Sequence, residues 1–138
     1  MTTPITIPGL RLATVLLALY GTVWISLEGN LVQVVVLGTG VTAVSLLHLL
    51  QRYLGDRLLS MSVWLMTAAA AGLGFGVGSV LLTIFLMALK TGLHAHGPEF
   101  TAAEIAWVWE QLPLWTLVGL LAGSGFGLLA AATALKNV

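Results

Sequence analysis

Apolar residues occur in four long segments, which short polar stretches separate. The segments cover about residues 12–27, 31–50, 63–89 and 113–135. Roughly 20 apolar residues carry a helix across the hydrocarbon core of a bilayer, where the backbone must satisfy its own hydrogen bonds. The pattern therefore predicts an all-α integral membrane protein, a four-transmembrane-helix bundle in a single membrane domain over residues 1–138.

A shorter amphipathic pattern lies between the third and fourth segments. Thr101 and Glu104 have the spacing of a capping box, which starts a helix by satisfying its first backbone N–H groups. Helical spacing then continues to Gln111, with Trp107 and Trp109 among the residues. Tryptophan side chains concentrate at the headgroup region of membranes. We therefore expect residues 101–111 to form a short interfacial helix.

Composition supports the membrane assignment. Of the residues, 59% are hydrophobic and 7% are charged, and the mean hydropathy is +1.05. A soluble domain has about 25% charged residues, so this chain could not cover a surface facing water. The net charge of zero argues against a nucleic-acid partner. The absence of cysteine excludes disulfides and thiolate chemistry, and we expect no cofactor.

The basic residues predict the orientation. Four of the five fall before the first segment, in the second connection and after the fourth segment: Arg11, Arg52, Arg57 and Lys136. These places share one side of the membrane if there are four spans. By the positive-inside rule both termini are cytoplasmic, in a bacterial inner membrane or its equivalent. The first residues lack the basic region and cleavage site of a signal peptide, so we expect the first segment to be retained.

Small residues form stripes on the third and fourth segments. At about 100° per residue, Gly72 and Gly76 share one face of the third segment, and Gly74 and Gly78 lie nearly opposite. The fourth segment has a single stripe that includes Gly119, Gly123 and Gly127. Small residues at such spacing let membrane helices approach closely. We expect these two segments to pack backbone to backbone. The second stripe would take the first segment, the second segment or another subunit.

Two groups of polar residues are candidates for chemistry. His94, His96 and Glu99 lie in one connection and have the donor types of a zinc-like metal site, although a polar interfacial loop has the same composition. Thr42, Ser45 and His48 lie on the second segment and form a possible polar lining. Ionisable residues inside a span are candidates for function, but structural hydrogen bonding also accounts for this histidine.

These features predict a non-catalytic protein. Serine residues lie within or at the ends of spans, with no histidine and acid nearby in the sequence, and no acidic residue lies inside a span. We expect an accessory, assembly or scaffold subunit of a larger membrane complex, with the bilayer, other membrane subunits or a second copy as partners. The first alternative is a small oligomeric transporter or channel lined by the second span. The second alternative is a metal-binding site in the outer-face loop.

Overall fold

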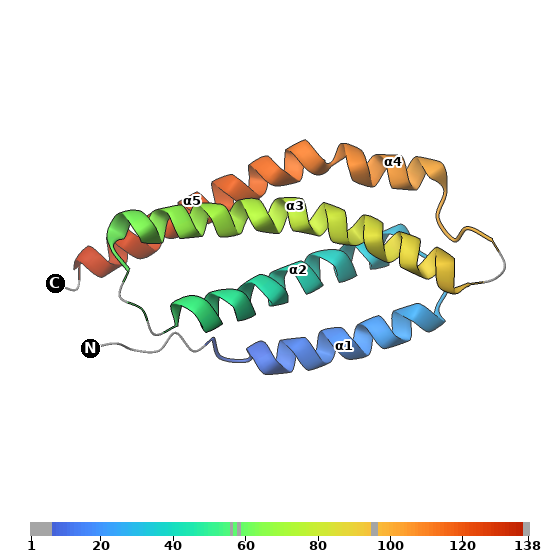
Figure 1. Ribbon diagram of the computed structural model, residues 1–138, viewed down its shortest axis with the longest axis horizontal. Coiled ribbons are helices and arrows are strands. Elements are labelled where there is room, and N and C mark those ends of the chain that lie inside the picture. Colours follow the sequence, from blue (N-terminus) through green and yellow to red (C-terminus); the bar gives the residue numbers. More distant parts are fainter. Residues whose placement is uncertain (1–6, 56, 58, 95–96, 137–138) are drawn as a thin grey trace.

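The computed structural model describes residues 7–136 except 56, 58, 95 and 96, and it leaves aside the side chains of 134–136. Within these residues all regular elements are helices, which confirms the all-α prediction. The helices are α1 (Leu10–Ser26), α2 (Leu31–Leu54), α3 (Met61–Leu93), α4 (Ala102–Glu110) and α5 (Leu112–Lys136). Figure 1 shows that α1, α2, α3 and α5 run along the long axis of the molecule, and that α4 follows α3 near its end.

Polar side chains begin three of the helices. The side chain of Asn30 accepts a hydrogen bond from the backbone of Val32 at the start of α2, and Ser60 caps α3 in the same manner. Thr101 and Glu104 form the expected capping box at the start of α4. Each cap satisfies a backbone N–H that a helix leaves without an internal partner.

Helices α2 and α3 extend beyond the apolar segments that mark them in the sequence. Helix α2 ends at Leu54 instead of residue 50, and α3 runs from Met61 to Leu93 instead of over residues 63–89. A charged side chain ends an apolar run without ending a helix. Arg52 and Lys90 both lie in last turns, where a cation interacts favourably with the carboxyl end of the helix.

Three helical stretches are long and apolar enough to cross a membrane. They are Leu31–Leu54, Met61–Leu93 and the combined stretch Ala102–Thr133, which includes α4 and most of α5. Helix α1 is apolar but has 17 residues, so it is about 25 Å long. That length is slightly less than the roughly 30 Å of a hydrocarbon core.

The helices pack in the order α1, α2, α3, α5. We call the end where α1 begins, α2 ends and α5 ends the Arg52 end, and the opposite end the Lys90 end (Figure 1). A core of side chains lies toward the Lys90 end and draws on α1, α2, α3, α4 and the segment before α4. Its buried members are Trp24, Val34, Leu37, Val80, Met87, Phe100 and Val108.

Helices α3 and α5 touch through their backbones. A Cβ atom added to Gly72 would overlap the carbonyl oxygen of Gly119, and one added to Gly123 would overlap the carbonyl oxygen of Ala68. Gly76 lies in the same way against the carbonyl oxygen of Trp115. Because any side chain at these positions would separate the helices, glycine is required for this close approach.

Helix α2 contacts the other face of α3. Gly78 lies against the methyl group of Thr42, and Gly74 is in ordinary contact with Leu46. A third glycine, Gly38 of α2, lies against the backbone and hydroxyl of Thr83. The neighbour at the second small-residue face of α3 is therefore α2 of the same chain. The stripes of small residues predicted from the sequence lie on the third and fourth segments, so the role of Gly38 on α2 emerges only from its contact with Thr83.

Replacing Gly123 by alanine tests the backbone contact. We expect Gly123→Ala to lower the free energy of unfolding by about 1–3 kcal/mol, the usual cost of overpacking. Gly125 is a matched control on the same helix, since a Cβ atom there meets nothing within 4 Å. Gly125→Ala should be neutral, or stabilising by up to about 1 kcal/mol from helix propensity. Thermal and denaturant unfolding in detergent micelles measures both, and equal stability of the two variants would contradict the contact.

Candidate functional site

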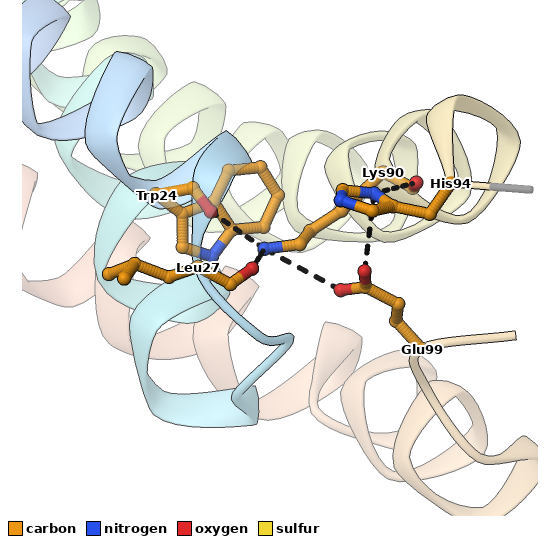
Figure 2. A network of polar contacts seen from close by, with 5 residues as sticks. All are labelled: Trp24, Leu27, Lys90, His94 and Glu99. Atoms are coloured by element: carbon orange, nitrogen blue, oxygen red, sulfur yellow. Dashed lines mark hydrogen bonds and ion pairs between the residues drawn. The ribbon is translucent and has the colours of Figure 1, made fainter. Parts of the chain in front are cut away.

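Five residues from separate parts of the chain meet at the Lys90 end. Figure 2 shows Trp24 and Leu27 from the end of α1, Lys90 and His94 from the end of α3, and Glu99 from the segment before α4. We call this group the Lys90 cluster. It joins the end of α1 to the end of α3, although these two helices make few other contacts along their lengths.

Lys90 is fully buried and is the centre of the cluster. Its Nζ atom donates to the carbonyl oxygens of Trp24 and Leu27, both at 2.6 Å. The same atom lies 4.4 Å from the centroid of the Trp24 ring, within range of a cation–π interaction. The last carbonyls of a helix lack partners inside the helix and form the negative end of its dipole. Lys90 thus caps the carboxyl end of α1 from another helix.

Glu99 supplies the countercharge. Its Oε2 atom lies 3.5 Å from Lys90 Nζ, and its Oε1 atom lies 3.2 Å from Nδ1 of His94. The Oε2 contact is an ion pair without hydrogen-bond geometry. Nδ1 of His94 is also 3.1 Å from the carbonyl oxygen of Lys90. Since both neighbours of Nδ1 are acceptors, this nitrogen carries a proton and donates.

Gly29 makes room for the carboxylate. A Cβ atom at Gly29 would lie 2.7 Å from Oε2 of Glu99, so a side chain in the α1–α2 turn would displace the acid. The turn, the end of α3 and the segment before α4 are thereby held together. A lysine has three N–H donors, and three oxygens surround this one. The cluster therefore forms a structural clamp between the end of α1, the end of α3 and the segment before α4.

The structure describes two of the three residues of the predicted metal site, His94 and Glu99. His94 and Glu99 are brought together, and His96 lies outside the described residues. Across the part of the chain that the structure describes, no three histidine or acidic side chains come together to hold a metal ion. The Lys90 ammonium already stands beside Glu99, where it would repel a metal cation. The metal site stays a prediction.

The polar residues of α2 have different surroundings from one another. Thr42 is buried against α3 and donates to the carbonyl oxygen of Gly38 at 2.8 Å. His48 is exposed, and its Nε2 atom lies 2.9 Å from the hydroxyl oxygen of Thr14 on α1. Ser45 lies between them and borders two grooves on either side of α2. The lining role of Thr42, Ser45 and His48 stays a prediction.

Sequence analysis misses the main polar feature of the structure. The apolar pattern of the sequence assigns no role to Lys90 or to Trp24. The two residues contact each other and are both buried, with exposed fractions of 0% for Lys90 and 1% for Trp24. One feature of the sequence could have pointed to this lysine. Lys90 is the sole lysine or arginine that follows the third apolar segment and precedes the fourth, and the stretch between the first two segments has neither residue type.

No family model, curated protein or solved structure matches the chain. The function must therefore be argued from the arrangement of the side chains.

Removing the lysine charge tests the clamp. We expect Lys90→Met to destabilise the protein by about 3 kcal/mol or more, because it leaves Glu99 and two helix-end carbonyls without their partner. The double variant Lys90→Met/Glu99→Gln should be more stable than Lys90→Met alone, since it removes the uncompensated charge. Unfolding in detergent micelles measures this double-mutant cycle. A change below about 0.5 kcal/mol in Lys90→Met, the range of ordinary surface substitutions, would show that the cluster contributes nothing.

Proposed function

We propose that this protein is a non-catalytic accessory, assembly or scaffold subunit of a larger membrane complex. The observation that carries the proposal is that the polar groups of the Lys90 cluster bind other groups of the same chain. Lys90, Glu99 and His94 are directed at one another and at backbone oxygens of the same chain. A catalytic or transport site needs polar groups that are free to meet a substrate, whereas these hold helices together.

The placement in the membrane is part of the proposal. We infer that α1 is a fourth span, with its short length compensated by Lys90, which holds its last carbonyls. Its outward side chains suit contact with lipid: Leu12, Val15, Leu16, Leu19 and Val23 are all more than half exposed. Arg11, Arg52 and Arg57 all lie at the Arg52 end, which by the positive-inside rule supports a cytoplasmic Arg52 end. Helix α4 would then lie near the opposite headgroups, with Trp107 and Trp109 exposed.

A groove between α2 and α5 is the proposed contact for a partner helix. Its floor is formed by Gly72 and Gly76 of α3, and it has a volume of about 590 Å³. Thr39 of α2 borders one side, and Val118 of α5 borders the other. A helix from another subunit seated in this groove would contact Phe75 of α3 and Leu114 and Val118 of α5. Close van der Waals contact of this kind favours helix association in lipid.

The transporter alternative has less support. His48 is bonded to α1, and Thr42 is turned into the α2–α3 contact. The groove beside His48 has mainly aliphatic walls. A path for a polar solute would need a continuous series of free polar groups, which these residues do not supply.

Purification from native membranes in mild detergent tests the subunit role. We expect other membrane proteins to co-purify with the wild type in fixed stoichiometry. Val118→Trp should reduce their recovery at least tenfold, because the indole would fill the proposed helix groove.

Leu121→Trp is the matched control for this experiment. Leu121 is on the same helix and is 63% exposed, but it lies outside the residues that line the groove. This variant should keep its partners. Recovery of the wild type as a monomer or homo-oligomer alone, without other subunits, would refute the accessory role.

A further inference from the structure

A second groove runs along α2 between α1 and α3. It has a volume of about 390 Å³ and extends along α1 from Thr14 to Ile25. From Thr14 to Ile25 the helix rises by eleven steps, about 16 Å, which is close to the depth of one leaflet of the hydrocarbon core. Its walls are mainly aliphatic, with Leu17, Ile25, Val41, Val44, Leu86 and Leu89 among them.

The lining of this groove suits a hydrocarbon chain, because its walls are mainly aliphatic and its polar residues are few. Aliphatic walls give water few hydrogen-bonding partners. In a bilayer, the groove would be filled by a single flexible apolar chain.

One end of the groove is polar. The hydroxyl of Thr14 donates its one proton to the carbonyl oxygen of Leu10 at 2.8 Å. The 2.9 Å contact with His48 must therefore be a hydrogen bond donated by Nε2 of the histidine. This bond joins α1 to α2 where the groove meets the Arg52 end.

Two arginines flank that bond on the side away from the groove. Arg11 lies three residues before Thr14, and Arg52 lies four residues after His48, so each is one turn further along the same helical face. Both are exposed, and neither forms an ion pair with any residue that the structure describes. Guanidinium groups bind phosphate through paired N–H donors, which makes this end complementary to a lipid phosphate.

We propose that this groove binds one acyl chain of an anionic phospholipid, with the lipid phosphate held between Arg11 and Arg52. The chain lies against Leu17, Val44 and Leu86 and ends beside Trp24. Trp24 is itself fixed by Lys90, so the clamp closes the far end of the lipid site. The inference rests on the proposed membrane placement and is independent of the subunit role. Loss of lipid and loss of protein partners are separate readouts.

Native mass spectrometry of the purified protein tests the site. The protein would be delipidated and offered phosphatidylglycerol and phosphatidylcholine with identical acyl chains in equal amounts. We expect one retained phosphatidylglycerol per chain. Retention of neither lipid, or equal retention of both, would overturn the proposal.

Charge-matched variants test the phosphate contact. Arg52→Gln should lower the preference for phosphatidylglycerol about fivefold, the effect of one basic residue near an anionic lipid. Arg57→Gln removes the same charge from the same end of the molecule but lies five residues further along the chain, beyond the end of α2. This control should change the preference less than twofold. Equal effects of the two variants would mean that the lipid is held by general surface charge, against the proposed site.

Enlarging a glycine that borders the groove, with a second glycine as the control, tests the acyl-chain contact. Gly21 borders the groove, and a Cβ atom there meets Leu37 at an ordinary 3.6 Å, so a larger side chain enters the groove. Gly21→Leu should abolish retention of the lipid. Gly125→Leu, in open space on α5, should retain it. If Gly21→Leu instead removes a co-purifying protein while no lipid is retained by the wild type, a partner segment occupies the groove and the lipid proposal is wrong.

Discussion

The structure depends on the close backbone approach on both faces of α3. On one side Gly72 and Gly76 lie against the backbone of α5, and on the other side Gly78 receives Thr42 of α2. In lipid, apolar side chains gain little by moving from hydrocarbon into a protein interior, so close van der Waals contact becomes the main source of helix association. A helix with small residues on two opposite faces can pack closely against two neighbouring helices. This explains why α3 lies between α2 and α5.

The two ends of the molecule are built differently. At the Lys90 end, side chains from α1, α2, α3 and α4 form a packed core beside a buried ion pair. At the Arg52 end, Arg11 and Arg52 are exposed, and a hydrogen bond from His48 to Thr14 joins α2 to α1. The Lys90 end therefore ties α1 to α3 and to the segment before α4. The Arg52 end leaves charged groups for contacts with lipid or with other molecules.

Lys90 links the fold to the proposed functions. A buried charge is costly unless its donors are satisfied, and here the partners are two carbonyls of α1 and a carboxylate. The lysine thus holds α1, the shortest of the four long helices, in place. At the same time it orients Trp24 at the end of the groove between α1 and α3. A scaffold subunit that carries one lipid would combine these properties, with the protein surface between α2 and α5 kept for a partner.

The amino-acid sequence by itself determines the class of protein and most of the helices. Apolar runs, the Asn30, Ser60 and Thr101 caps and the glycine spacing are local features, and each acts through neighbouring residues in the chain. They also predict that small faces of α3 will meet other helices. The ends of α2 and α3 are less predictable, because helical hydrogen bonding continues through polar residues such as Arg52.

Only the tertiary structure decides which residues meet across the chain. The contact of Lys90 with Trp24 spans 66 positions, and no local pattern relates the two residues. The choice of α2 as the second neighbour of α3 depends on Gly38 fitting against Thr83, a match between two helix surfaces. Both grooves likewise arise from spaces between helices, since each is bordered by residues of three different helices. The candidate site is therefore a property of the packing, whereas the apolar character of the long helices is a property of the sequence.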